Sequence, residues 1–346
     1  MEIIEVVVNE FVDNSDNYTR AVDLLNNSEV VAFPTETVYG LGAVATDDVA
    51  VKKIFTAKGR PSDNPLIVHI GTTEELSLYI EHISEAAKLC MDAFWPGPLT
   101  LVMDVKPNVL APSVTAGLET VGMRMPDHPV ALGLLRTLGK PLAAPSANLS
   151  GKPSPTKAIH VAEDLAGRIE CVLDGGATGI GLESTVLDVT VETPVILRPG
   201  GVTKEMLEAV IGPVLAPDLE EQKMESTPKA PGMKYTHYAP NAPVYLIKEN
   251  EEIVARAITT LQQQGHQVAL LAPHQFNRMQ ANYFFAFGEA DQPHQMAATM
   301  YDALRACDKT DATIILATAT AKEGVGVAIM NRLEKAAGGQ WYGKGE

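Results

Sequence analysis

Short runs of strand-forming residues, separated by turns of Gly and Pro, recur through the first 200 residues and constrain the fold more than any other feature. Eight such runs occupy 29–34, 65–70, 99–105, 120–126, 141–146, 171–176, 184–190 and 194–200. Segments with the apolar period of helices lie between several of them, at 47–59, 74–95 and 128–139. This mixture predicts an α/β (α+β) domain built on a large mixed sheet.

The stretch 211–242 interrupts this pattern. It contains five prolines and has no sustained period of either 2 or 3.6 residues, which is typical of a linker. After it, strand and helix patterns alternate to the end of the chain, which predicts a smaller parallel three-layer α/β domain. The predicted division is therefore 1–210, a linker at 211–242, and 243–346.

The charge balance limits the partners of the chain. With 27 basic and 43 acidic residues, the formal net charge is −16, which argues against binding nucleic acid or an anionic membrane through bulk charge. The start of the chain is acidic where a signal peptide needs positive charge, and no apolar run reaches 18 residues. The three cysteines are far apart and predict neither disulfides nor a thiolate metal site. We therefore expect a cytoplasmic protein.

Two polar segments follow apolar strands near the N-terminus. The first, PTETVYGLG (34–42), offers hydroxyls, a carboxylate and glycines, which suit either a small polar ligand or an ordinary capped turn. In the second, KGRPSDNP (58–65), Lys58 and Arg60 could hold phosphate oxygens or form a solvated basic loop. His69 in the following strand is either a ligand-binding residue or a core histidine.

Further candidates lie at other strand ends. Arg124 is part of an otherwise apolar strand, so it needs an anionic partner, which is either a protein carboxylate or a substrate anion. The loop 144–156 is rich in hydroxyl groups and could hold a nucleotide through backbone amides and serines. Gly-rich turns at 175–185 and 197–201 are weak signals by themselves. No nucleophile elbow, HExxH motif or paired-carboxylate signature is present, which disfavours covalent hydrolysis and zinc chemistry.

In order and in almost every residue, these motifs resemble those of the YrdC-like threonylcarbamoyl-AMP synthases in their longer two-domain form. The resemblance rests on PTETVYGLG, KGRPSDNPLIVHI, FWPGPLT, VGMRMPDHPV, APSANLSGKPSPT, ESTVLDV and ILRPGG, with APGMKYTHYAP (230–240) as the linker. It implies a twisted mixed sheet with helices and a concave cleft at 1–210, a linker that acts as a lid, and a Rossmann-like C-terminal domain.

The resemblance also implies a nucleotidyltransferase. Such an enzyme converts L-threonine, bicarbonate or CO2, and ATP with Mg²⁺ into L-threonylcarbamoyl-AMP and pyrophosphate. A separate tRNA threonylcarbamoyl transferase then uses the product to modify tRNA. No membrane partner and no stable complex with nucleic acid are expected.

Residue by residue, the resemblance assigns ligands to the motifs. The L-threonine site is expected at Thr35, His69, Arg124 and Ser184. The ATP site is expected at Lys58, Arg60, Asn64, Thr120, Ala144, Ser146, Ser154 and Arg198, with Tyr235 or His237 reaching the nucleotide from the linker. Lys58 and Arg60 would act on the phosphates as catalytic residues, and no protein metal ligand is expected.

Two alternatives remain. The first is an RNA-binding or regulatory module on the same fold, although residues 1–210 carry 15 basic and 28 acidic residues and few interleaved aromatics. The second is the carbamoyl-transfer domain of a maturation factor. Such chains add acylphosphatase and zinc-finger segments, for which this sequence has no room.

Overall fold

The computed structural model describes residues 1–6, 15–216 and 238–343, which form two compact units. Of these, residues 151–154, 180–182 and 238–343 make up the second unit, and the other described residues belong to the first. Most of the predicted linker, including Tyr235 and His237, lies outside the described residues. None of the described helices is both long and apolar enough to cross a membrane.

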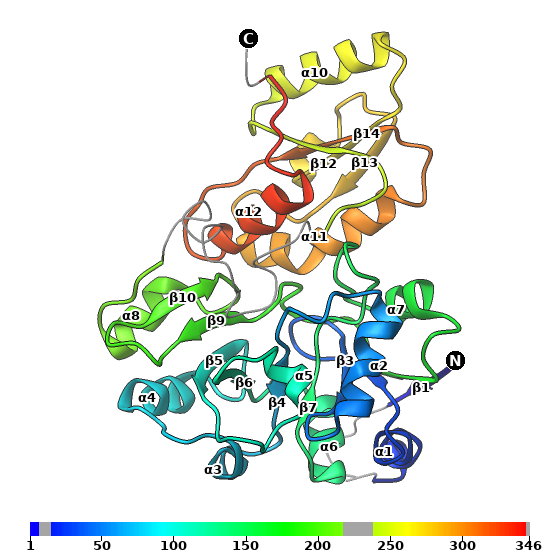
Figure 1. The fold of residues 1–346 in the computed structure, drawn as a ribbon. Helices are drawn as coiled ribbons and strands as arrows, with labels where there is room; N and C mark the ends of the chain where they lie inside the picture. Colours follow the sequence, from blue (N-terminus) through cyan, green and yellow to red (C-terminus); the bar gives the residue numbers. More distant parts are fainter. Residues whose placement is uncertain (7–14, 217–237, 344–346) are drawn as a thin grey trace. The chain divides into compact units, whose positions relative to one another are not determined.

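The first unit contains a ten-stranded mixed sheet, which confirms the predicted fold class (Figure 1). The strands lie in the order β1-β8-β2-β3-β7-β4-β6-β5-β9-β10. Their bounds are β1 (Glu2–Glu5), β2 (Val31–Phe33), β3 (Gly40–Val44), β4 (Ile67–His69), β5 (Leu99–Asp104), β6 (Thr120–Arg124), β7 (Leu142–Ala143), β8 (Cys171–Asp174), β9 (Thr185–Asp188) and β10 (Val195–Arg198). The sheet contains both parallel pairs, such as β4–β6, and antiparallel pairs, such as β5–β6.

Helices surround this sheet. Their bounds are η1 (Ser15–Tyr18), α1 (Thr19–Asn26), α2 (Asp48–Lys58), η2 (Thr73–Glu75), α3 (Leu76–Tyr79), α4 (Glu85–Phe94), α5 (Pro112–Thr115), α6 (Pro129–Leu138), α7 (Ala158–Leu165) and α8 (Lys204–Ile211). Side chains of α2, α4, α7 and α8 join the larger apolar core on one face of the sheet. Side chains of α1 and α6 join a second core against β2, β7 and β8 on the other face.

Local signals explain where helices begin and end. The carboxylate of Asp47 caps α2 by accepting hydrogen bonds from the backbone N–H groups of Val49 and Ala50. The same helix ends at Gly59, whose φ of 60° is the left-handed conformation that favours glycine. α6 begins with Pro129 and ends at Gly139 in the same conformation. These boundaries agree with the predicted helices at 47–59 and 128–139.

The single helical segment predicted over 74–95 is wrong. The structure divides it into η2, α3 and α4, because Ile80 adopts an extended conformation and forms a β-bridge with Val105. The hydroxyl of Ser84 then caps α4 by accepting a hydrogen bond from the N–H of Ala87. A long-range backbone pairing therefore overrides an apolar pattern that is continuous along the sequence.

The second unit contains a four-stranded parallel sheet in the order β11-β14-β12-β13, as predicted for the smaller domain. Its elements are β11 (Val244–Ile247), α10 (Glu251–Gln263), β12 (Val268–Ala272), η3 (His274–Phe276), β13 (Tyr283–Ala286), α11 (Pro293–Cys307), β14 (Ile314–Thr318) and α12 (Val325–Ala336). α10 packs on an apolar core with β11, β12 and β14. α11 packs against α12.

Two short loops from the N-terminal part of the sequence belong to the second unit. Ala239 donates a backbone hydrogen bond to the carbonyl of Gly151, at 2.9 Å. Arg305 of α11 donates to the carbonyl of Pro153, at 2.6 Å. Gly181 packs so closely on α11 that a Cβ atom there would lie 2.5 Å from the carbonyl oxygen of Ala297. These contacts explain why residues 151–154 and 180–182 group with the C-terminal part.

Candidate functional site

Two neighbouring parallel strands end in the ionisable residues His69 and Arg124. β4 ends at His69 and β6 ends at Arg124, and these two residues are partners in the strand register. Both side chains are buried. They alternate with Val68 and Met123, which join the larger core, so they project from the opposite face of the sheet. The structure therefore places these two predicted threonine-binding residues together.

The ring of His69 is neutral at physiological pH. Burial and the nearby charge of Arg124 lower its pKa from 6.5 to about 3. Its Nδ1 atom is buried without a hydrogen-bond partner in the described structure, and the ring meets Phe33 edge-on. A neutral imidazole with an unsatisfied nitrogen can exchange a hydrogen bond with a polar ligand without adding charge.

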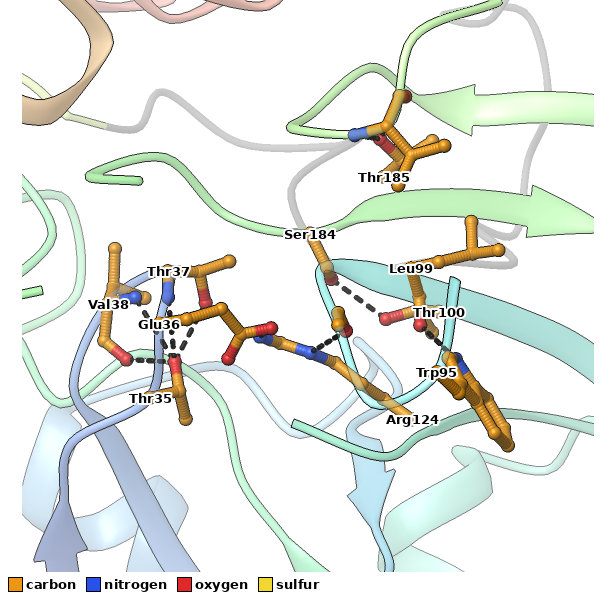
Figure 2. A network of polar contacts seen from close by, with 12 residues as sticks. Thr35, Glu36, Thr37, Val38, Trp95, Leu99, Thr100, Arg124, Ser184 and Thr185 are labelled. Atoms are coloured by element: carbon orange, nitrogen blue, oxygen red, sulfur yellow. Dashed lines mark hydrogen bonds and ion pairs between the residues drawn. The ribbon is translucent and has the colours of Figure 1, made fainter. Parts of the chain in front are cut away.

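Arg124 already has a protein carboxylate as its partner. Its Nη2 atom lies 2.6 Å from Oε1 of Glu36, and its Nε donates to the carbonyl oxygen of Gly97 at 3.3 Å (Figure 2). The side chains of Arg124 and Glu36 are only 4% and 11% exposed, so water screens their attraction weakly. The internal ion pair considered for Arg124 is thus present, and its binding of a substrate carboxylate stays a prediction.

A second buried network surrounds Ser184. Its hydroxyl lies 2.8 Å from the hydroxyl of Thr100 at the start of β5. Arg198, the last residue of β10, donates to the carbonyl oxygen of Ser184 at 2.9 Å and to its hydroxyl at 3.1 Å. The antiparallel pairing of β9 and β10 brings these residues together. Gly200 permits the close approach, since a Cβ atom there would lie 2.3 Å from the backbone nitrogen of Thr185.

The segment 95–100 connects the two networks. The indole N–H of Trp95 donates to the carbonyl of Leu99 at 2.7 Å, and the backbone N–H of Gly97 donates to Met125 at 2.8 Å. The carbonyl of Gly97 accepts a hydrogen bond from Arg124. The hydroxyl of Thr100 contacts that of Ser184, as Figure 2 shows. This turn therefore contacts two of the predicted threonine-binding residues, Arg124 and Ser184.

Thr35 organises the loop after β2. Its hydroxyl donates to the carbonyl of Val38 at 2.6 Å, lies 2.8 Å from the hydroxyl of Thr37, and accepts from two backbone N–H groups. This is the capped turn considered as the alternative for the segment 34–42. The turn presents the Glu36 side chain toward Arg124 (Figure 2).

Lys58 and Ser146 lie beside this loop. Lys58 ends α2, and its buried ammonium group donates to the carbonyl oxygens of Ser146 and Asn148. The hydroxyl of Ser146 donates to Oδ1 of Asn148. Ser146 also forms a β-bridge with Gly40, the first residue of β3. The structure therefore joins the predicted phosphate-binding lysine to the hydroxyl-rich loop.

Other predicted ATP-binding residues gather where β4 and β6 begin. Arg60 is half-buried and donates at 3.4–3.5 Å to the carbonyls of Asn64 and Pro65. The backbone N–H of Ala144 donates to the carbonyl of Ile67, the first residue of β4. Thr120 begins β6, two residues before the register partner of Ile67. The predicted nucleotide and threonine groups therefore lie toward opposite ends of the same pair of strands.

Of the remaining four predicted ATP-binding residues, two lie elsewhere in the structure and two are outside its described part. Ser154 is buried but belongs to the second unit. Tyr235 and His237 lie outside the described residues. Arg198 is placed with Ser184, one of the predicted threonine-binding residues.

Sequence reasoning did not assign a function to Glu36 or Thr100. Both occur in motifs quoted above, but a carboxylate in a turn and a threonine at the start of a strand are common. The signal that identifies Glu36 is its partner: an arginine in an apolar strand requires an anion, and Glu36 supplies it. That pairing joins residues far apart in the sequence and becomes visible only in the folded chain.

The described residues contain no group of three or more His, Cys, Asp or Glu side chains that could hold a metal ion. The groups gathered near the predicted phosphate positions are cations, hydroxyls and amides, which suit phosphate oxygens. A Mg²⁺ ion that arrives with a nucleotide is compatible with this set of donors.

Comparisons with known proteins agree with the motifs. Residues 23–200 match a family model described as "Telomere recombination", and residues 202–338 match one described as "Threonylcarbamoyl-AMP synthase, C-terminal domain". A curated threonylcarbamoyl-AMP synthase from Bacillus subtilis is 53% identical over 335 residues, which is 96% of each chain. The Pyrococcus abyssi enzyme of the same name is 48% identical, with 92% of this chain and 93% of the relative covered.

A solved structure supports the same family assignment. The crystal structure described as P. abyssi Sua5 complexed with L-threonine matches with a TM-score of 0.93 and 44% identity, over 99% of each chain. The match spans both units and every motif in the described residues. The chain therefore belongs to the threonylcarbamoyl-AMP synthase family.

Proposed function

We propose that this protein is an L-threonylcarbamoyl-AMP synthase, which makes L-threonylcarbamoyl-AMP and pyrophosphate from L-threonine, bicarbonate or CO2, and ATP. The observation that carries the proposal is the buried cationic site itself. Arg124, Arg198 and Lys58 are each buried at the end of a regular element, and each is held by polar groups from distant loops. The related proteins of the same name support the same reaction.

The chemistry requires positioning rather than a protein nucleophile. The amine of threonine adds to the carbon of CO2, one C=O electron pair moves to oxygen, and loss of a proton leaves a carbamate. A carbamate oxygen then attacks the α-phosphorus of ATP. As this O–P bond forms, the bond to pyrophosphate breaks and its electrons leave with pyrophosphate.

We assign the residues of the site to these steps. Arg124 binds the threonine carboxylate, with Ser184, His69 and Thr35 around the rest of the molecule. Lys58 and Arg60 bind the phosphates and stabilise the charge that develops on pyrophosphate. ATP also contacts Asn64, Thr120, Ala144, Ser146, Ser154 and Arg198, and Tyr235 or His237 closes over it to exclude water.

Lys58 and Arg60 would hold the phosphates, and Mg²⁺ bound with the triphosphate would add charge neutralisation for the leaving group. The adenylate is unstable in water, so a tRNA threonylcarbamoyl transferase must consume it soon after release. All three substrates and tRNA are available in the cytoplasm, where we place the enzyme. The family match over the whole chain favours this enzymatic function over an RNA-binding module.

The test is a reconstitution that omits each substrate in turn. Pyrophosphate and an AMP-linked product should form only when ATP, threonine and bicarbonate are all present. Release of ADP and orthophosphate instead would show a different phosphoryl-transfer reaction. A shift of double-stranded RNA at physiological salt, without product formation, would support the binding module.

A further inference from the structure

Glu36 is the most unusual buried group of the described site. Its side chain is 11% exposed, and neither carboxylate oxygen has a hydrogen-bond partner in the described structure. Within the described residues, its polar contact is the ion pair with Arg124. Buried carboxylates normally accept several hydrogen bonds, because desolvation is otherwise poorly compensated. Glu36 therefore has acceptor capacity that the protein itself does not use.

The chemistry of an amino acid matches this unused capacity. The carboxylate and ammonium groups of an α-amino acid are separated by a single carbon, so a site that recognises both must offer a cation and an anion side by side. Arg124 and Glu36 are such a pair, with their charged atoms 2.6 Å apart. When an amino acid enters, one internal ion pair can be exchanged for two pairs with the ligand, and the net charge of the site stays constant.

The surroundings favour Glu36 as the partner of the ammonium group. Burial keeps His69, the neighbour of Arg124 on β4, in its neutral form, so its ring neither repels nor neutralises a second cation. Thr35 fixes the turn that carries Glu36. The hydroxyls of Thr35, Thr37, Thr100 and Ser184 are engaged within the protein and carry no charge.

We propose that Glu36 binds the ammonium group of the substrate, so that Glu36 and Arg124 together select an α-amino acid zwitterion. This proposal rests on the proposed function and names the part of the site that recognises the reacting nitrogen. It assigns Glu36 as a further substrate-binding and specificity-determining residue. A hydroxy acid of the same shape presents no cation and should leave Glu36 without its partner.

The experiment compares two ligands and needs no catalysis. Calorimetry without ATP measures the affinity of the full chain for L-threonine and for 2,3-dihydroxybutanoate, in which a hydroxyl replaces the ammonium group. The wild-type protein should prefer threonine. Glu36→Gln keeps the shape of the side chain but removes its charge, and should weaken threonine binding about 10- to 100-fold. Binding of the hydroxy acid should change little, so the preference should collapse.

Glu29→Gln is the matched control. Glu29 also forms an ion pair, with Lys53 at 2.6 Å, but it is partly exposed and lies outside the described site. This variant should retain the wild-type preference between the two ligands. If Glu36 acts only by neutralising Arg124, Glu36→Gln should change the affinity of both ligands by the same factor, and that result would overturn the proposal.

Glu36→Gln leaves a buried arginine without its ion-pair partner, so folding is checked by thermal denaturation. If that variant does not fold, Glu36→Asp retains the charge but shortens the reach by one methylene and should reduce the preference for threonine. An unchanged preference in a folded Glu36→Asp or Glu36→Gln protein contradicts the assignment. Failure of the wild-type protein to bind threonine at all contradicts the proposed function instead.

Discussion

At the scale of single residues, Arg124 combines a structural and a predicted functional contact. Its guanidinium group reaches Glu36 with one nitrogen and the carbonyl of Gly97 with another. A planar, multidentate cation can keep its contact with Gly97 while it exchanges Glu36 for a substrate carboxylate, whereas an ammonium group cannot reproduce this geometry. This distinction allows its two functions to be separated experimentally.

We predict that Arg124→Lys weakens threonine binding by about tenfold or more, through loss of the bidentate geometry. The affinity for ATP should fall much less. Calorimetric titration of each ligand into the folded variant measures both effects. Equal losses for the two ligands, or a large decrease in melting temperature alone, would indicate that Arg124 serves only the internal ion pair.

We predict that substitutions of Arg60 and Arg198 have different effects on the use of ATP and threonine. Arg60 donates to the backbone carbonyls of Asn64 and Pro65, whereas Arg198 holds Ser184, one of the predicted threonine-binding residues. Arg60→Ala should reduce kcat/KM for ATP by about 10- to 150-fold and leave the KM for threonine nearly unchanged. Arg198→Ala should impair the use of both substrates. Steady-state kinetics with each substrate varied in turn would reveal identical profiles if this distinction is wrong.

The lowered pKa of His69 predicts how stability responds to acid. In the unfolded chain His69 binds a proton near pH 6.5, whereas in the folded chain it does so only near pH 3. Between these values the unfolded state binds more protons, so the free energy of unfolding falls as the pH decreases. His69 should contribute about 1.4 kcal/mol per pH unit to this decrease in the free energy of unfolding.

His69→Asn should remove this contribution. Denaturant unfolding between pH 6.5 and 5 would show a shallower loss of stability in the variant than in the wild-type protein. His294, whose side chain is exposed, supplies the control variant His294→Asn, which should retain the wild-type slope. Parallel slopes for the wild type and His69→Asn would contradict a neutral, buried ring.

At the scale of elements, the pairing of β9 with β10 sets the position of Ser184. A Cβ atom on Gly200 would lie 2.3 Å from the nitrogen of Thr185 and 2.5 Å from the carbonyl oxygen of Glu183. Both contacts are with backbone, so the strand itself must move. The position of the predicted threonine-binding hydroxyl therefore depends on a glycine that contacts no ligand in our assignment.

Gly200→Ala should decrease the free energy of unfolding by about 1–3 kcal/mol and also raise the KM for threonine. Urea denaturation and kinetics measure the two effects. Gly179→Ala is the control, because no atom lies within 4 Å of its Cβ position and its φ is not in the left-handed region. A Gly200→Ala protein as stable and active as the control would show that the strands tolerate the extra methyl group.

At the scale of the whole molecule, the two compact units do not follow the sequence order strictly. All ten strands of the large sheet precede residue 199. Loops 151–154 and 180–182, however, group with the C-terminal unit through contacts such as Arg305 with the carbonyl of Pro153. The core of the first unit is therefore formed by residues at or before position 216, whereas the conformations of loops 151–154 and 180–182 depend on contacts with the C-terminal residues.

A chain that ends at residue 216 should fold cooperatively, since it retains the large sheet and both of its apolar cores. Amide hydrogen exchange should accelerate at 151–154 and 180–182 but stay slow in β2, β5 and β8. Catalysis should decline because Ser154 loses its surroundings. Equal protection of these loops in the truncated and full-length chains would contradict their dependence on the second unit.

Local sequence signals are enough to predict the type of each domain, most elements and the set of motifs, because apolar period, capping residues and glycine turns act over a few residues. Asp47, Gly59 and Pro129 fix helix ends without help from distant residues. The family resemblance likewise depends on short motifs that can be read in order. The division of 74–95 could not be read in this way, because it results from pairing with Val105.

Which polar and charged side chains contact one another depends on the folded chain. The pair Glu36–Arg124, the hydroxyl contact Thr100–Ser184 and the anchoring of Ser184 by Arg198 each join separate strands or loops. Their energies depend on burial and on distances of about one hydrogen bond, which sequence spacing does not specify. The motifs therefore supplied the chemical groups, and strand pairing in a desolvated interior made them a site.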